Sequence, residues 1–198
     1  MIKTDFDRFI GVDFAQRLKE LIGSRNDDPD HFALAVLVNT NPVLVVEDGF
    51  DGVVSMGEAE EVFFTWAGLK RPVRSAIEVN AAGANYYQNL QRRMITRGMY
   101  FQISPITTTR NKGVRMTEMA PDFQSGTMKV SDEGTPFLKR FEALWLAFGT
   151  RAKDDPLDAV YLARQAAYYL LPHDKPSANQ SHVTAPPNPF RQIEMAYR

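Results

Sequence analysis

The sequence predicts an α/β fold with a mixed central sheet of five or more strands and helices on both faces. Short apolar runs rich in β-branched residues alternate with longer segments of helical periodicity. Three predicted strands come first, helices and strands then alternate, and helices come last, an order typical of a sheet covered on both sides. With 198 residues, the chain is long enough for one substantial core, so one domain is expected.

The composition fits a globular protein and narrows the classes of function. Hydrophobic residues make up 44% and no run of about 18 apolar residues occurs, so we expect no membrane partner. The N-terminus lacks the apolar core of a secretory signal and the chain has no cysteine, which favours a cytoplasmic protein. Because the net charge is only −1, any nucleic-acid surface must be local.

In the N-terminal third, apolar runs predict three strands in an antiparallel meander. The first ends in a single acid, Asp13, and the spacing of Leu18, Leu21 and Ile22 predicts a helix after it. Turn formers separate the second strand from the third. The predicted strands are residues 8–14, 32–38 and 43–46, with the helix over 15–22 and the turn over 39–42.

Two helix and strand pairs follow in the middle of the chain. Ser55 and Glu58 have the spacing of a capping box, which opens a helix to Gly68. We expect its apolar stripe to consist of Val62, Phe63, Trp66 and Leu69. The remaining predictions are a strand over 73–79, a helix between Gly83 and Gly98, and a strand over 99–103.

The C-terminal part begins with a polar loop and ends with two apolar helices. Thr135 and Pro136 open the first helix, whose apolar spacing marks a core element. The second is apolar nearly all round and is expected to pack on the sheet. The predicted elements are a polar loop over 106–117 leading to a short helix near Met116, an edge strand over 126–130, and helices from 135 to about 148 and from 155 to about 171. We expect the domain to span 1–172, with a flexible polar tail over 173–198.

Two carboxylates open the last helix. Asp155 precedes Pro156, and Asp158 follows three residues later on the same helical face. A capping acid and a favourable charge at the positive helix end would explain both residues without any function.

Two further acids close predicted strands, Asp13 and Glu78. Ligand sites of open α/β sheets form beyond the carboxyl ends of their strands, so three separate segments can deliver acids to one place. Buried acids require pairing or a metal. A turn-initiating or capping role for Asp13, and an ion pair of Glu78 with Arg74 or a nearby lysine, remain alternatives.

Such a site would consist entirely of oxygen ligands. The chain has no cysteine, and its three histidines, His31, His173 and His182, lie in loop-like contexts. Mg²⁺ or Mn²⁺ are the matching metals. Two such ions held by Asp13, Glu78, Asp155 and Asp158 would suit phosphodiester cleavage, with Asp13 as the bridging ligand.

A basic stretch offers a surface for the phosphates of DNA. From Val79 to Thr117 there are no acids, and the near-zero net charge hides this asymmetry. The basic residues are Arg92, Arg93, Arg97, Arg110, Lys112 and Arg115. A solvated helix face would explain the first three, whereas the basic loop near a cation site is well placed to grip phosphates.

Five motifs together resemble, in order, the C-terminal nuclease domain of the large terminase subunits of tailed bacteriophages. The resemblance covers residues 8 to 171. The motifs are Gly11-Val12-Asp13-Phe14-Ala15, Ile77-Glu78-Val79-Asn80-Ala81-Ala82-Gly83, Asn111-Lys112-Gly113-Val114-Arg115, Gly126 to Val130, and Phe148 through Asp154-Asp155-Pro156-Leu157-Asp158-Ala159.

This resemblance implies an RNase H-like fold and metal-dependent cleavage of double-stranded DNA during genome packaging in the host cytoplasm. It assigns metal ligation to Asp13, Glu78 and Asp155, with Asp158 as a further ligand and Asp154 in an uncertain role. Lys112 and Arg115 match a basic loop that handles DNA or positions the site. The implied partners are a terminase ATPase domain, a small terminase subunit and the portal.

One departure from the family pattern is the lack of a Gly-x-x-x-x-Gly-Lys-Ser/Thr loop. We therefore expect a nuclease domain separated from its ATPase, or a nuclease encoded on its own. Two alternatives stay open: another RNase H-like nuclease such as a Holliday junction resolvase, and a non-catalytic packaging scaffold. A serine or cysteine hydrolase is poorly supported, since no Gly-x-Ser-x-Gly motif occurs.

Overall fold

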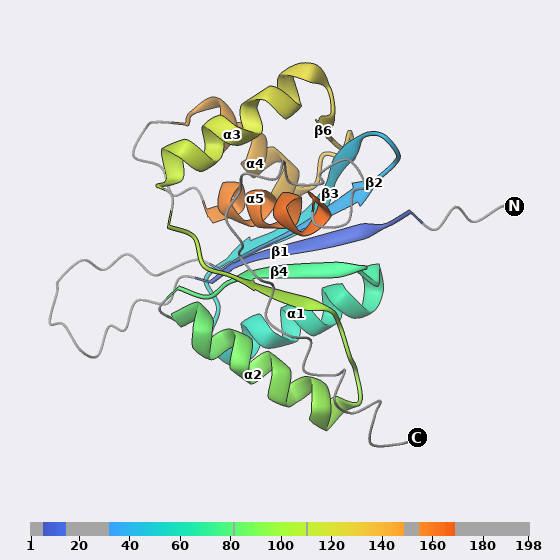
Figure 1. Ribbon diagram of the computed structural model, residues 1–198, viewed down its shortest axis with the longest axis vertical. Coiled ribbons are helices and arrows are strands. Elements are labelled where there is room, and N and C mark those ends of the chain that lie inside the picture. Colours follow the sequence, from blue (N-terminus) through green and yellow to red (C-terminus); the bar gives the residue numbers. More distant parts are fainter. Residues whose placement is uncertain (1–5, 15–31, 81, 110, 149–154, 169–198) are drawn as a thin grey trace, which may run out of the picture.

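A six-stranded mixed sheet forms the centre of the protein in the computed structural model, which describes residues 6–80, 82–109, 111–148 and 155–168 apart from 15–31 (Figure 1). The strand order is β5-β4-β1-β2-β3-β6. β1, β2 and β3 pair antiparallel, while β4 lies parallel to β1, β5 to β4, and β6 to β3. The strands are β1 Arg8–Phe14, β2 Phe32–Asn39, β3 Leu44–Gly52, β4 Arg74–Glu78, β5 Ile103–Ile106 and β6 Met128–Val130.

Helices cover both faces of this sheet. In Figure 1, α1 and α2 lie on one side of the sheet, and α3, α4 and α5 lie on the other. The helices are α1 Met56–Lys70, α2 Ala82–Arg97, α3 Lys112–Ser125, α4 Pro136–Leu146 and α5 Asp155–Tyr168. The predicted α/β architecture, including the antiparallel meander and the edge strand near 126–130, is therefore confirmed.

Side-chain alternation along β1 divides the interior into two cores. Ile10 and Val12 pack with the residues of α1 and α2, whereas Phe9 packs with those of α4 and α5. Because successive side chains of a strand point to opposite faces, Gly11 and Asp13 share the face of Phe9. Asp13 thus lies on the side of the sheet that α5 covers.

Gly11 allows α5 to touch the sheet directly. A Cβ atom at this position would lie 2.0 Å from the carbonyl oxygen of Ala159 and 2.2 Å from the backbone nitrogen of Ala163. Side chains on α5 are buried almost all round, as its apolar composition predicted. The contact fixes the height of α5 above β1, and therefore the height of its first turn above the end of that strand.

Several local predictions were wrong. On α1 the capping box of Ser55 and Glu58 is present, but Leu69 is 74% exposed, and Phe64 and Ala67 are buried in its place. The predicted polar loop over 106–117 is shorter, because α3 begins at Lys112 with Asn111 as its N-cap. The strand expected over 99–103 begins only at Ile103.

Some predictions fall on residues outside the described ranges. These are the helix over 15–22, the end of the last helix beyond Tyr168, and the tail over 173–198. Within the described ranges, none of the helices combines the length and the apolar character needed to cross a membrane.

Candidate functional site

Asp13 and Glu78 lie side by side at the carboxyl ends of two parallel strands. The register pairs Val12 of β1 with Ile77 of β4, so the next residues along both strands are Asp13 and Glu78. Ala76, two residues before Glu78, belongs to the core under α5, which gives Glu78 the same face of the sheet as Asp13. The two carboxylates therefore meet on one face, about one strand spacing of 4.8 Å apart at the backbone.

The first turn of α5 adds Asp155 and Asp158 above these strand ends. Gly11 holds α5 against β1 through Ala159, the residue that follows Asp158. Asp158 is only 2% exposed, and Asp13 is 8% exposed. A capping role near the helix start therefore coexists with a position over the strand acids.

All three other acids affect the pKa of Asp13. Burial raises the pKa of Asp13 well above its ordinary value, and the negative charges of Asp158, Glu78 and Asp155 raise it further. The ammonium of Lys112 opposes this rise. Three carboxylates, from β4 and from the first turn of α5, thus lie close enough to affect the charge of Asp13 at this edge of the sheet.

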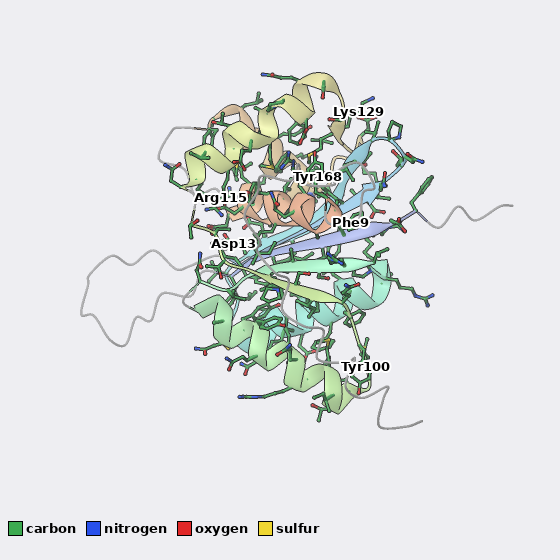
Figure 2. The ribbon with its side chains drawn as sticks, viewed as in Figure 1. Phe9, Asp13, Tyr100, Arg115, Lys129 and Tyr168 are labelled. Atoms are coloured by element: carbon green, nitrogen blue, oxygen red, sulfur yellow. The ribbon has the colours of Figure 1, made fainter. Side chains whose placement is uncertain are left out.

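Two basic side chains from the start of α3 reach into the same cluster. Lys112 Nζ lies 2.5 Å from Asp158 Oδ2, and Arg115 Nη1 lies 3.1 Å from Asp158 Oδ1. Arg115 Nη1 is also 3.5 Å from Glu78 Oε2, so its guanidinium bridges α5 and β4. In Figure 2, Arg115 and Asp13 lie at the same end of the sheet.

Hydrogen bonds fix the orientation of the Glu78 carboxylate. Asn80 Nδ2 donates to Glu78 Oε1 at 2.7 Å, and the Thr108 hydroxyl donates to the same oxygen. Oε2 is then the oxygen on the side of Arg115. Asn80 and Thr108 were not among the residues predicted for the site. The position of Asn80, two residues after a strand-ending acid, was the available signal.

Gly83, near the start of α2, lets that helix pack against the backbone at the end of β4. A Cβ atom there would lie 1.9 Å from the carbonyl oxygen of Glu78, so the start of α2 touches the backbone at the end of β4. Any side chain at position 83 would push this backbone away. The end of β4 is therefore held by α2 as well as by its side-chain hydrogen bonds.

The donor chemistry of the site fits a hard divalent cation. A buried carboxylate such as Asp13, whose pKa is raised by burial and by neighbouring acids, is costly to ionise unless a cation balances its charge. Across the described part of the chain, no three acidic or histidine side chains have metal-binding spacing as they stand. Asp158 instead contacts Lys112 and Arg115. Asp13, Glu78, Asp155 and Asp158 are the residues that would hold Mg²⁺ or Mn²⁺.

The other basic residues predicted to bind DNA lie elsewhere or outside the described ranges. Arg93 donates to Glu60 at 2.6 Å and to Glu61 at 2.8 Å, and Arg97 also donates to Glu61. These ion pairs tie α2 to α1. Arg93 lies eleven residues beyond the start of α2, about 16 Å along the helix. The ion pairs favour a role in holding α2 to α1, and a DNA contact by Arg93 or Arg97 stays a prediction. Arg110 and Asp154 fall outside the described residues.

Arg115 differs most from the expected surface role. Its side chain is 10% exposed, and its guanidinium lies 5.9 Å from the ring centre of Tyr161. An arginine enclosed in this way positions the two acids that it contacts. Of the two roles that the resemblance offered for Arg115, its burial favours positioning of the site over DNA handling.

Comparison with solved structures identifies the fold. No protein-family model matches the sequence, and no curated protein matches it. The human cytomegalovirus terminase nuclease domain, Mn-soaked and inhibitor-bound, superposes with a TM-score of 0.57 at 14% identity, covering 81% of this chain and 83% of that chain. The large terminase nuclease of thermophilic phage G20c with bound magnesium gives 0.55 at 12% identity, covering 82% of both chains.

A longer protein contains the same fold. The large terminase of another thermophilic bacteriophage matches with a TM-score of 0.54 at 10% identity, over 80% of this chain but 39% of that chain. The predicted RNase H-like nuclease fold of terminases is thereby confirmed as a fold.

Proposed function

We propose that this protein is a divalent-metal-dependent endonuclease that cleaves double-stranded DNA during viral genome packaging. One observation carries the proposal: Asp13 and Glu78 end neighbouring parallel strands on the face that α5 covers, where Asp155 and Asp158 begin the helix. The similarity in fold to terminase nucleases studied with manganese, magnesium or cobalt supports it.

The protein's own residues would hold and orient the reacting groups. Asp13, fixed by a central strand, is the best candidate for a ligand shared by two metal ions. Glu78 would offer Oε2, because Oε1 already accepts hydrogen bonds from Asn80 and Thr108. Bound metal would supply an activated water and charge stabilisation at the leaving oxygen. Asp155 and Asp158 would complete the site from the helix side.

The proposed substrate is concatemeric viral DNA, cut in the host cytoplasm. The longer phage terminase that shares this fold is more than twice the length of the region matched, and it was studied with ATP-γ-S and with ADP. We propose that an ATPase domain, a small terminase subunit and a portal act together with this nuclease. The ATPase would supply translocation, which needs a nucleotide site.

Plasmid cleavage in Mn²⁺ tests the proposal. Asp13→Asn should abolish cleavage, because it removes the central metal ligand while keeping the side chain's shape. Asp7→Asn is the matched control: it makes the same change six residues earlier, just before β1 and about 20 Å away, and should cleave normally. Normal cleavage by the Asp13→Asn protein would refute the assignment of that residue.

The choice of DNA substrate separates the remaining alternatives. A terminase-type nuclease should cut linear duplex and plasmid DNA, whereas strong preference for four-way junctions would favour a resolvase. If the parent protein shows neither Mn²⁺ binding heat nor nicking, a scaffold role replaces the enzymatic one.

A further inference from the structure

Two cations that contact the same carboxylate differ in how firmly they are enclosed. Arg115 and Lys112 approach opposite oxygens of Asp158, at 3.1 Å and 2.5 Å. The side chain of Arg115 is 10% exposed, while that of Lys112 is 31% exposed. Arg115 is therefore enclosed in the interior, whereas almost a third of the Lys112 side chain is open to solvent.

The contacts of the two side chains also indicate that Arg115 is held more firmly than Lys112. Arg115 bridges Asp158 and Glu78 and lies over the ring of Tyr161, so moving it would break contacts with α5 and β4 together. Lys112 sits at the first residue of α3, directly after the N-cap Asn111. A lysine stem at a helix end can rotate outward without disturbing the helix, since its flexible chain of four methylene groups carries a single compact charge.

The surroundings of Asp158 favour a counter-cation. Asp158 is almost fully buried, and together with Glu78 and Asp155 it lies close enough to Asp13 to raise the pKa of that residue. A divalent cation bound by these acids would take over the neutralisation that Lys112 supplies. It would also repel the ammonium, because two positive charges within a few ångströms in a partly buried site destabilise each other.

We propose that Lys112 is a displaceable internal cation of the acidic site. In the metal-free protein it neutralises Asp158; when a divalent ion occupies the acids, Lys112 leaves Asp158 and contacts a DNA phosphate at the mouth of the site. Arg115 stays in place in both states. This inference rests on the proposed function. The Lys112 side chain would then couple the binding of metal to the binding of DNA.

Mn²⁺ titration calorimetry and thermal denaturation test the first half without any cleavage assay. Lys112→Met should bind Mn²⁺ roughly tenfold more tightly than the parent, because the competing charge is gone. In EDTA the same variant should melt at a lower temperature than the parent, because Asp158 loses a counter-charge, and Mn²⁺ should raise its Tm by more. If Lys112 only supported the fold, Lys112→Met would lower the Tm by the same amount in EDTA and in Mn²⁺, and this result would contradict the inference.

Two further variants control this result. Lys112→Arg keeps the charge and should retain the metal affinity of the parent within about twofold. Lys70→Met removes an ion-paired lysine of similar burial, whose Nζ lies 3.4 Å from Glu47 Oε1 on another part of the sheet. It should leave Mn²⁺ affinity unchanged. Equal Mn²⁺ affinities for the parent and Lys112→Met would overturn the inference and leave the nuclease proposal standing.

DNA binding in Ca²⁺, measured by fluorescence anisotropy with a short duplex, tests the second half. Ca²⁺ should strengthen DNA binding by the parent, and the loss caused by Lys112→Met should be several-fold larger in Ca²⁺ than in EDTA. The same loss in both conditions would overturn the coupling. Absence of any metal binding by the parent would instead refute the proposed function itself, so the two failures are distinguishable.

Discussion

Asp13 is held in a position that is unfavourable for a charged side chain. Burial and three neighbouring carboxylates raise its pKa, so the folded protein binds its proton more tightly than the unfolded chain does. Above the ordinary pKa of an aspartate, Asp13 therefore lowers the stability of the fold, and this penalty disappears as the solution becomes acidic enough to protonate Asp13 in both the folded and the unfolded state. A residue with this cost is typical of a functional site.

We therefore predict that Asp13→Asn stabilises the metal-free protein at neutral pH. Gains at such sites are roughly 0.5–2 kcal/mol, which corresponds to about 1–8 °C in Tm for a chain of this size. Thermal denaturation in EDTA at pH 7 measures this. The gain should shrink as the pH approaches the ordinary range of an aspartate, and added Mn²⁺ should stabilise the parent but not the variant.

The pKa of Glu47 is shifted in the opposite direction to that of Asp13. Burial works against its ionisation, but hydrogen bonds and charge from Arg8 and Lys70 outweigh burial and lower its pKa. Its carboxylate therefore stabilises the fold above its ordinary pKa, and this contribution is lost as the pH falls through the lowered value. Glu47→Gln should reduce Tm at pH 7 and much less in acid. A pH-independent change in both variants would contradict this electrostatic account.

Arg93 is predicted to support the fold and not to bind DNA. Its partner Glu60 is 6% exposed, so Arg93→Gln leaves a buried carboxylate without its cation. The expected loss is about 1–3 kcal/mol of unfolding free energy, measured by urea denaturation. DNA affinity should stay within twofold of the parent, whereas a large loss of affinity with unchanged stability would support the DNA contact predicted from the sequence.

The positions of the acids were predictable from local sequence, but their cationic partners were not. A strand-ending Asp13, a strand-ending Glu78 and the three-residue spacing of Asp155 and Asp158 are all readable without the fold. The ion pairs of Asp158 depend on where α3 docks relative to α5, which no local pattern encodes. For the same reason the sequence suggested a surface role for Arg115, whose guanidinium is enclosed.

At the scale of elements, the contact between α5 and β1 decides where the helix acids lie. We predict that Gly11→Ala is strongly destabilising, because the added methyl group would overlap backbone atoms of Ala159 and Ala163, which cannot rotate away as a side chain would. Overpacking costs roughly 1–3 kcal/mol and sometimes more. A loss of that size in chemical denaturation, together with weaker Mn²⁺ binding, is the expected result.

Gly57→Ala supplies the matched control on α1. A Cβ atom at Gly57 meets nothing within 4 Å, so alanine should be neutral or should stabilise the helix by up to about 1 kcal/mol. Equal effects of the two substitutions would show that the close approach at Gly11 does not constrain α5.

Element boundaries were predicted well where capping and periodicity agreed, and poorly where polar residues are paired in the fold. β3 extends to Gly52, well beyond the predicted end at 46, because Asp51 pairs with Arg140 and Asp48 accepts a hydrogen bond from Thr135 at 2.7 Å. Such acids resemble loop residues in sequence. Likewise α3 contains Pro121, a residue that argues against a helix until its docking is known.

At the scale of the whole molecule, positive charge is abundant in one stretch of sequence, and most of the basic residues of that stretch that the structure describes are paired with acids. Four of the six basic residues between 79 and 117 take part in ion pairs: Arg93, Arg97, Lys112 and Arg115. Among the residues that the structure describes, the basic side chains near the acidic site are thus paired with acids, and we expect DNA binding to depend on metal more than on a basic groove.

We therefore predict a shallow salt dependence for duplex binding in Ca²⁺. Two or three phosphate contacts would reduce affinity by roughly 10- to 40-fold between 50 and 200 mM salt, whereas a groove with six or more contacts would lose about a thousandfold or more. Fluorescence anisotropy across this range measures the slope. The Lys112→Met protein should have a slope smaller by about one contact, and Arg93→Gln should leave it unchanged. A steep slope that falls in Arg93→Gln would instead show that α2 forms part of the DNA surface.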